Sequence, residues 1–397
     1  MDGRAIEGAR PEFLFYLPYA RLSETHQRAP WIMFGRSFAA LGYRATLLCG
    51  KFDVTPVPAG VDVVETGRTS NSSMFRRFFE AVLDPVIAFR RIGNREPDLV
   101  MIGPLGPAIL TSLLLMWLYR HWPGSPRRRR TRFVLKADAN LLNYGVGRGL
   151  SRMMDALLVA SSRGFDVVTV ETFCSLHRAR SLSGARSDVF FRLPSGYPQG
   201  VLARRGYTDG GPREHRILCA ARIVPHKGQD VLLRAFESLA PEFPDWTVRI
   251  VGDPVDRAYA AHLEELARRP ALAGRVVFGG FQAWPEMERE FERAAIFCLP
   301  TLHESEGTVK YEATILGAPV VTTEVPCAFD AREAGWIVAH AGDPAELSRR
   351  LHDLMQDDDL RRRTVATAQS RLRSYLDRAR ELLARLGEPP TDPSVGR

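Results

Sequence analysis

Short apolar runs alternate with helical patterns along most of the chain. The first run covers residues 13–17, a helical pattern follows at 31–41, and a second apolar run covers 44–49. Apolar runs bounded by turn residues are typical of buried strands, and their alternation with helices favours a parallel sheet wrapped by helices. Further strands of this series are predicted at 61–65, 99–102, 132–135, 167–170 and 189–193.

A second series of the same kind begins after a turn at residues 194–196. Its strands are predicted at 216–220, 247–251, 276–278, 296–299 and 319–322. We therefore predict an α/β protein with two Rossmann-like domains, residues 1–198 and 199–372, followed by a C-terminal helix and a disordered tail over 373–397. Ligands of open α/β sheets bind beyond the carboxyl ends of the strands, so two facing halves would form a cleft.

A loop with two glutamates follows the fourth strand of the second series. Glu304 and Gly307 lie in the loop, and Glu312 lies in a helix that is predicted to begin near Thr308. The free N–H groups and the positive dipole at such a helix start attract an anion, usually phosphate. Carboxylates suit sugar hydroxyls, because they accept hydrogen bonds from them. Phosphate with sugar on either side describes a nucleotide diphosphate sugar.

The spacing of Glu304 and Glu312 resembles the Glu-x7-Glu signature of the family 4 retaining glycosyltransferases, which have the GT-B fold. The resemblance implies that Glu304 orients the transferred sugar and that Glu312 holds the ribose. It also implies that backbone amides near Gly307 and Thr308 meet the sugar and the β-phosphate. Two glutamates are equally compatible with a solvated helix start, so a second motif has to decide.

A basic turn at the start of the second half is that second motif. Its first strand leads to Arg222, and a short turn delivers Lys227 and Gly228 before the next helical pattern. Two cations at one sheet edge would neutralise a diphosphate, the arginine as a planar fork and the lysine as a point charge. A solvated basic surface is the alternative. The segment is similar to the Gly-Arg…Lys-Gly segment of the same family, whose arginine and lysine bind the donor diphosphate.

Two smaller matches follow in the same order. Gly252 ends the second strand of this half, and Phe281 follows the third. The resemblance implies nucleotide binding here, with the backbone near Phe281 meeting the base. It covers about residues 216–363, and the N-terminal half more loosely.

The N-terminal half departs from the family where the acceptor would react. The first loop, residues 18–26, lacks the glycine pair that most members have. The predicted strand 132–135 ends in Lys136 and Asp138, where many members place a histidine near the reacting carbon. We name Lys136 and Asp138 as candidate substrate-binding residues. A surface salt bridge between a lysine and an aspartate at a strand end is the alternative interpretation.

Composition narrows the class of binding partner less than the motifs do. The 397 residues suit two or three domains, and the net charge of +8 indicates an anionic partner, which could be a nucleotide, nucleic acid or an acidic membrane. A nucleic-acid role is disfavoured, because no recognised nucleic-acid-binding motif accompanies the arginine run at 127–130. No metal and no other cofactor is expected, since there is no Asp-x-Asp or histidine cluster suited to divalent ions.

Cysteine usage and the N-terminus predict a cytoplasmic protein. The five cysteines are odd in number and widely spaced, mostly within apolar runs, so we expect reduced core residues. Residues 1–10 are polar and lack the apolar segment of a signal peptide.

Two segments of the first half leave membrane contact open. Residues 74–91 place apolar side chains on one face with arginines near the ends, as interfacial helices do, although a buried helix gives nearly the same stripe. Residues 107–122 are almost wholly apolar but short for a bilayer span. We interpret them as a helix packed on the sheet whose end, with the arginines beyond it, could touch anionic lipid on the inner face of a membrane.

These observations together predict a retaining, metal-independent glycosyltransferase. It would move a sugar from a UDP or GDP sugar to an unknown acceptor, either a glycan or a lipid-linked molecule. Arg222, Lys227 and Glu304 are the candidate catalytic residues, since preorganised cations would stabilise charge developing on the leaving diphosphate. The alternatives are a nucleotide-sugar epimerase or phosphorylase with the GT-B fold, and a nucleotide-sugar-binding protein without catalytic activity.

Overall fold

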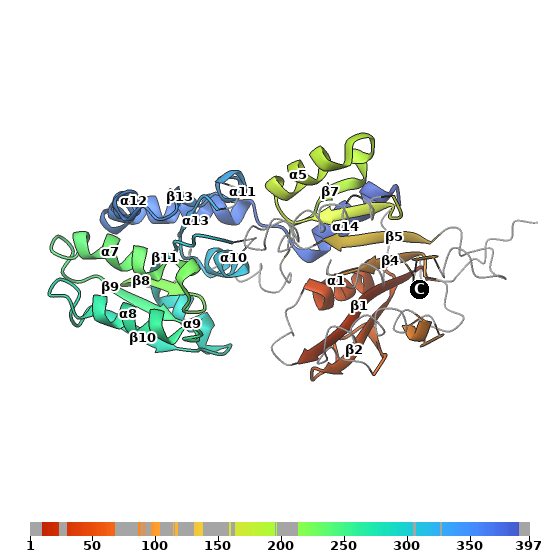
Figure 1. Ribbon diagram of the computed structural model, residues 1–397, viewed down its shortest axis with the longest axis horizontal. Coiled ribbons are helices and arrows are strands. Elements are labelled where there is room, and N and C mark those ends of the chain that lie inside the picture. Colours follow the sequence, from red (N-terminus) through yellow and green to blue (C-terminus); the bar gives the residue numbers. More distant parts are fainter. Residues whose placement is uncertain are drawn as a thin grey trace, which may run out of the picture. The chain divides into compact units, whose positions relative to one another are not determined.

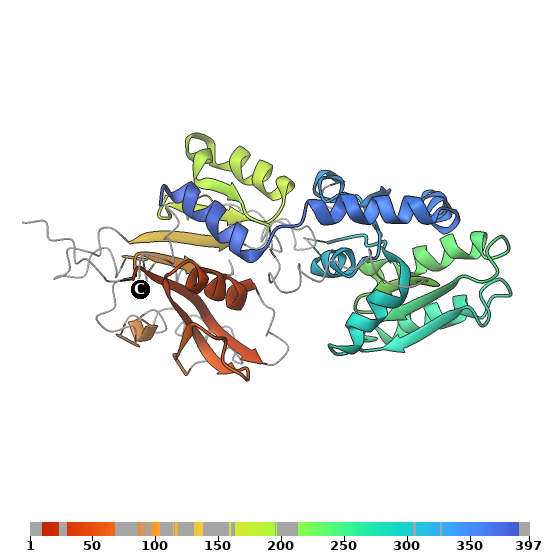
Figure 2. The ribbon, with the colours of Figure 1, turned by 180° about the vertical axis from the view of Figure 1, so that it is seen from behind.

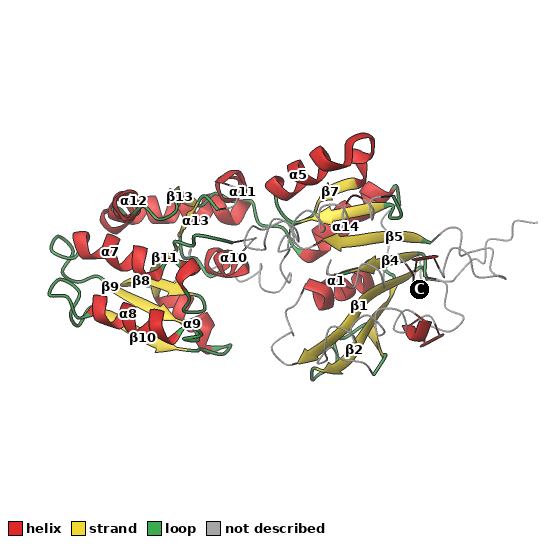
Figure 3. Cartoon of the chain, in the orientation of Figure 1, coloured by secondary structure: helices red, strands yellow, loops and turns green. Residues whose placement is uncertain are grey.

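The computed structural model describes two compact units, which are considered separately below. One unit comprises residues 1–198 with 373–397, and the other comprises residues 199–372 (Figure 1). The described residues are 10–23, 30–67, 86–88, 90–91, 97–103, 114, 116–117, 131–137, 159, 163–194, 196, 213–304, 307–325 and 328–388. Figure 3 shows the strands of each sheet side by side with helices around them.

The first unit is built on a seven-stranded parallel sheet in the order β3-β2-β1-β4-β5-β6-β7. Its strands are β1 (Glu12–Ser23), β2 (Arg44–Asp53), β3 (Val61–Glu65), β4 (Leu99–Ile102), β5 (Arg132–Ala137), β6 (Val167–Val170) and β7 (Phe190–Arg192). Its described helices are α1 (Pro30–Ala40), α5 (Phe173–Ser183), the 3-10 helix η4 (Gly184–Val189) and α14 (Tyr375–Leu386). The central strands β4 and β6 are buried throughout and mainly apolar, as is typical of parallel sheets covered by helices, whereas the edge strand β3 is partly exposed.

Helix α14 belongs to the first unit, although the sequence suggested a separate C-terminal segment. Tyr375 packs edge-on against Phe34 of α1, with ring centroids 5.3 Å apart. Gly196 approaches so closely that a Cβ there would lie 2.5 Å from the backbone nitrogen of Tyr375. Figures 1 and 2 both show α14 lying beside α1. The apolar face of α14 therefore completes the core of the first unit.

The second unit contains a six-stranded parallel sheet in the order β10-β9-β8-β11-β12-β13. Its strands are β8 (Glu214–Ala220), β9 (Thr247–Val251), β10 (Val276–Gly280), β11 (Ala294–Leu299), β12 (Val320–Thr323) and β13 (Ile337–Ala339). Its helices are the 3-10 helix η5 (Pro225–Lys227), α7 (Gln229–Leu239), α8 (Arg257–Ala267), α9 (Glu286–Arg293), α10 (Thr308–Ile315), α11 (Ala328–Glu333), α12 (Pro344–Gln356) and α13 (Asp358–Ser370). All the strands predicted from the sequence are present, and β13 is an additional one.

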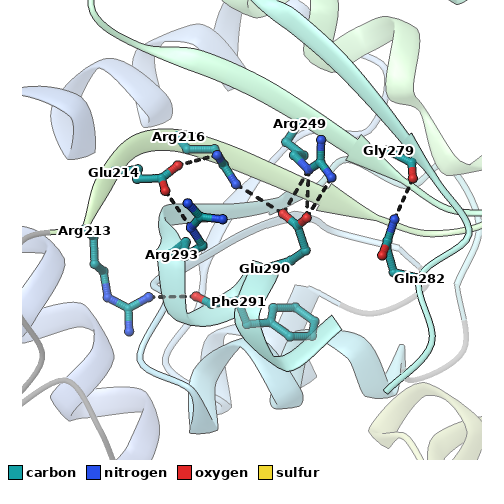
Figure 4. Close-up of polar contacts among 9 residues, drawn as sticks. All are labelled: Arg213, Glu214, Arg216, Arg249, Gly279, Gln282, Glu290, Phe291 and Arg293. Atoms are coloured by element: carbon teal, nitrogen blue, oxygen red, sulfur yellow. Dashed lines mark hydrogen bonds and ion pairs between the residues drawn. The ribbon is translucent and has the colours of Figure 1, made fainter. Parts of the chain in front are cut away.

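A polar network fixes α9 against this sheet (Figure 4). Glu290 of α9 accepts hydrogen bonds from Arg216 of β8 at 3.2 Å and from Arg249 of β9 at 2.9 Å. Arg213 donates to the carbonyl of Phe291 at 2.8 Å, near the end of α9. Charge-assisted bonds of this kind are stronger than neutral ones. The network therefore holds α9 against β8 and β9.

Three of the cysteines are described as free and buried, as the sequence predicts: Cys49, Cys219 and Cys298. Burial raises the pKa of Cys49 and of Cys219 to about 12, because the thiolate would lose its water. These thiols therefore stay protonated and act as small apolar core residues.

Several predictions concern residues outside the described ones. They include most of the helices predicted at 74–91 and 107–122, the arginine run 127–130, Asp138 and the end of the C-terminal tail. The short described pieces of the two predicted helices are helical. Among the described helices, none combines the length and the apolar character needed to cross a bilayer.

Candidate functional site

Four neighbouring strands of the second unit end where the predicted donor-site residues begin. Arg222 and Lys227 follow β8, Gly252 follows β9, Phe281 follows β10 and Glu304 follows β11. The order runs from β8 to β10 on one side and from β11 to β13 on the other, so the direction reverses between β8 and β11. Ligands of open parallel sheets bind at such a switch point. The two main motifs of the sequence therefore flank it.

The two motifs meet in an ion pair. Lys227 Nζ donates to Glu304 Oε2 at 2.6 Å across 77 residues of sequence. Both side chains are largely shielded from solvent, with 13% of Lys227 and 11% of Glu304 exposed. Gly228 permits the approach, because a Cβ there would lie 2.1 Å from the carbonyl oxygen of Pro300. The basic turn thus lies directly against the loop after β11.

Backbone hydrogen bonds lock the turn and the loop together. The carbonyl of His226 accepts from the backbone N–H of Leu302 at 2.7 Å and from the hydroxyl of Thr301 at 2.9 Å. Thr301 is fully buried, so this bond is protected from water. Lys227 and Glu304 therefore stand on a connected piece of backbone.

Arg222 and Gly252 lie side by side at the ends of β8 and β9. A Cβ at Gly252 would lie 1.9 Å from the carbonyl oxygen of Ala221, so only glycine fits against the start of the basic turn. Gly252 donates its N–H to the carbonyl of Gly280 at 2.8 Å. Arg222 is exposed, and 69% of Phe281 is exposed beyond β10. The structure brings these residues to one sheet edge.

Gly307 starts α10 beside the ion pair. Its φ of +69° is a left-handed conformation, and no side chain caps the helix. A Cβ at Gly307 would lie 3.1 Å from Glu304 Cγ, so the glutamate stem passes directly over this residue. Thr308 is exposed in the first turn, and Glu312 is half-buried one turn further on. The first N–H groups of α10 are thus available to an anion next to Glu304.

The pKa of His226 is affected by the charges of the surrounding site. Its pKa is lowered, first by burial and then by the positive charges of Lys227 and Arg222, while Glu304 opposes the shift. Both predicted cations therefore act on one imidazole. The sequence motifs did not identify His226, nor Lys310 of α10, which also lies at this site. The only sequence signal for Lys310 is its charge in the first turn of the predicted helix.

Lys136 lies in the first unit and is paired differently from the prediction. Only 4% of its side chain is exposed, and its Nζ donates to Glu171 Oε1 at 3.2 Å. Glu171 follows β6, the strand beside β5, so the pair lies at the carboxyl edge of the sheet. Lys136 is therefore not a surface lysine, Asp138 lies outside the described residues, and Glu171 was not recognised in the sequence. Its partner could be identified only from the strand order.

The described part of the chain contains no cluster of side chains suited to binding a metal ion. No group of three or more His, Cys, Asp or Glu residues there could hold a metal ion. Independence from metal stays a prediction, which a chelator can test.

The second unit matches a known protein family. Residues 211–371 match the family described as "Glycosyl transferases group 1". The matched segment includes Arg222, Lys227, Glu304, Gly307 and Glu312. The part of the chain that matches this family is therefore the part that carries both sequence motifs.

The curated relatives are glycosyltransferases that this chain matches over part of its length. A D-inositol 3-phosphate glycosyltransferase of Streptomyces scabiei is 34% identical over 176 residues, or 42% of this chain and 39% of that protein. A GDP-mannose-dependent monoacylated alpha-(1-6)-phosphatidylinositol monomannoside mannosyltransferase of Corynebacterium glutamicum is 30% identical over 223 residues, or 51% of this chain and 56% of that protein. The chain thus spans less than two thirds of the length of these relatives.

Solved structures with a similar fold cover nearly the whole chain. Anabaena Alr3699/HepE in complex with UDP and glucose has a TM-score of 0.66 at 17% identity, covering 95% of this chain and 99% of that chain. A UDP-forming trehalose-phosphate synthase from Burkholderia xenovorans has a TM-score of 0.70 at 12% identity, covering 96% of this chain and 100% of that chain. At these identities the likeness concerns the fold. The predicted α/β class of GT-B type is confirmed.

Proposed function

We propose that the protein is a glycosyltransferase that uses a nucleotide diphosphate sugar as donor, because residues 211–371 match the glycosyl transferases group 1 family. The ion pair between Lys227 and Glu304 carries this proposal. It joins the cation expected at the diphosphate to the carboxylate expected at the sugar, at the switch point of the sheet. UDP and glucose in a structure of the same fold, and a relative named for GDP-mannose, support a donor of this class.

Charge stabilisation of the leaving diphosphate is the proposed source of catalysis. Arg222 and Lys227 would stabilise the negative charge that develops as the bond to the sugar breaks, aided by the free N–H groups at the start of α10. Lys227 would exchange Glu304 for a phosphate oxygen, and the freed carboxylate would accept hydrogen bonds from sugar hydroxyls. Transfer would proceed with retention and without a metal, as the family resemblance implies.

Lys136 and Glu171 are proposed to bind the acceptor. An isolated lysine would favour an anionic group, whereas a lysine paired with a glutamate offers a donor and an acceptor to a neutral hydroxyl. We propose a glycan or lipid-linked acceptor, with the protein in the cytoplasm and in contact with the inner face of a membrane. The relative named for a phosphatidylinositol mannoside supports a lipid acceptor.

Thermal stability with a panel of nucleotides tests the donor assignment. A ligand that binds only the native state at about 100 times its Kd adds about 2.7 kcal/mol of stability. UDP, GDP, UDP-glucose and GDP-mannose should be compared, with AMP as the control. At least one nucleoside diphosphate should raise the Tm clearly above AMP, also in EDTA. A panel without any shift would overturn the proposal.

Turnover assays separate the alternatives. Release of nucleoside diphosphate that rises with added lipid or glycan acceptor supports the transferase. Conversion of the donor sugar without an acceptor would indicate an epimerase, and dependence on inorganic phosphate would indicate a phosphorylase. Binding without any donor turnover would indicate a nucleotide-sugar-binding protein.

A further inference from the structure

A buried lysine that the motifs do not use lies beside the candidate donor site. Lys310 is in the first turn of α10, and only 4% of its surface is exposed. Its Nζ lies 4.9 Å from the centroid of the Trp336 ring. A cation over an indole face is attracted by the negative face of the ring. The attraction to Trp336 therefore offsets part of the hydration free energy that Lys310 loses on burial.

Trp336 is held in this orientation by α10 itself. Its Nε1 donates to the hydroxyl of Thr314 at 2.9 Å, and that hydroxyl donates to the carbonyl of Lys310 at 3.0 Å. Tyr311 packs edge-on against the indole, with ring centroids 4.6 Å apart. The ring that faces Lys310 is thus fixed on several sides, and the position of the cation is fixed with it.

Lys310 reaches back from α10 to the loop that carries Glu304. Long side chains in a helix point toward its N-terminus, which here is Gly307. A Cβ at Gly307 would lie 2.8 Å from Lys310 Cε and 3.3 Å from Glu304 Cδ. The two side chains therefore pass the same point, on the side of Gly307 where a Cβ is missing.

The charge balance of the site depends on Lys310. Arg222 and Lys227 supply two positive charges, and Glu304 and Glu312 supply two negative ones, so these four residues sum to zero. A neutral set of side chains gains little Coulomb energy from a diphosphate. Lys310 gives an excess of one positive charge, which burial shields from screening by salt.

Building on the proposed donor function, we propose that Lys310 is a positioning residue for Glu304 and the source of the excess positive charge of the donor site. Lys227 pairs with Glu304 from the turn after β8, and Lys310 would hold it from α10, since both side chains pass Gly307. When Lys227 turns to the donor diphosphate, Lys310 keeps the carboxylate in place for the sugar. Lys310 acts through Glu304 and through its field, without touching the phosphate.

Nucleotide affinity distinguishes this role from a structural one. The Kd values of UDP and GDP should be measured by calorimetry for wild type, K310M, K310R and K51M. Methionine keeps the length and the contact with Trp336 but removes the charge. We expect K310M to raise the Kd of the nucleotide that binds wild type about tenfold, the change that a loss of 1.4 kcal/mol produces. K310R should stay within about threefold and K51M, at an exposed lysine, should match wild type.

Thermal stability and a double-mutant cycle complete the test. Burying a charge costs stability, so K310M should leave the Tm unchanged or raise it if the lysine serves binding. The effects of K310M and E304Q on the turnover number for donor hydrolysis should be clearly less than additive, because the two residues act as one unit. A K310M variant with wild-type affinity, or additive effects in the cycle, would overturn this inference alone. Wild-type protein that binds neither nucleotide would instead overturn the proposed function.

Discussion

Each unit of the molecule carries a shielded lysine–glutamate pair at the carboxyl edge of its sheet, and the two pairs are built differently. In the first unit Lys136 of β5 meets Glu171 at the end of β6, 3.2 Å apart. In the second unit Lys227 and Glu304 stand on a turn and a loop, 2.6 Å apart. Strands are held by their neighbours on both sides, whereas loops depend on fewer contacts. The second pair is therefore better able to exchange partners.

The surroundings of the two pairs strengthen this contrast. Next to Lys227 and Glu304 lie a second buried cation, Lys310, and the uncapped start of α10. The pair of the first unit lies between adjacent buried strands, with the hydroxyl of Thr169 bonded to the carbonyl of Leu135. Under the proposed function, the pair of the first unit would be a fixed contact for the acceptor, and the pair of the second unit would open when the donor binds.

The largest effect is expected from breaking the pair of the first unit. E171Q removes the charge that neutralises Lys136, and a buried charge without compensation costs about 3 kcal/mol or more. Urea unfolding followed by circular dichroism should show this loss, and the double variant K136M/E171L should recover most of it. E264Q, at an exposed glutamate, is the matched control. If E171Q unfolds like wild type, the first pair is not the fixed element that the comparison assumes.

The pair of the second unit should matter for activity more than for stability. K227M removes a preorganised cation, so we expect kcat/KM for donor turnover to fall about 100-fold or more. Its Tm should fall less than that of E171Q, because Glu304 lies in a loop from which it can turn to water. Turnover within about threefold of wild type would show that both pairs are structural, and the contrast would be lost.

Gly307 tests whether the loop of the second pair needs its close packing. G307A places a Cβ against Lys310 and Glu304 and forces a left-handed alanine, which costs about 1–2 kcal/mol. G274A is the matched control, since Gly274 has a φ of +76° but open space around it. If G307A and G274A lose the same unfolding free energy and bind nucleotide equally well, backbone strain alone explains the effect of G307A. We expect G307A, and not G274A, to weaken nucleotide binding.

The smallest effect is expected from the pH dependence of His226. Its pKa lies below the usual value in the folded state, so the unfolded chain binds the extra proton more readily. The stability that this histidine contributes is thus present at neutral pH and is lost as pH falls below about 6.5. The Tm of wild type should decline more than that of H226Q between pH 7 and pH 5. Parallel declines would show that burial and the charges of Lys227 and Arg222 do not lower the pKa of this imidazole.

The sequence by itself determined the elements and the donor motifs. The predicted strands at 61–65, 99–102, 167–170 and 247–251 agree with β3, β4, β6 and β9 to the residue. The start of α12 also follows a local rule, since Asp343 caps it by accepting from the N–H groups of Ala345 and Glu346. Periodicity, turn residues and caps involve neighbours in the chain, so a linear pattern records them.

Tertiary structure alone decided which charges meet. Glu171 reaches Lys136 across 35 residues because β5 and β6 are neighbours, and Lys310 lies over Trp336 because the segment after α11 returns to α10. The packing of α14 on the first unit and the three-residue strand β13 arise in the same way, from partners that are distant in sequence. A local pattern specifies which residues can carry charge, but burial and pairing depend on distances that only the folded chain sets.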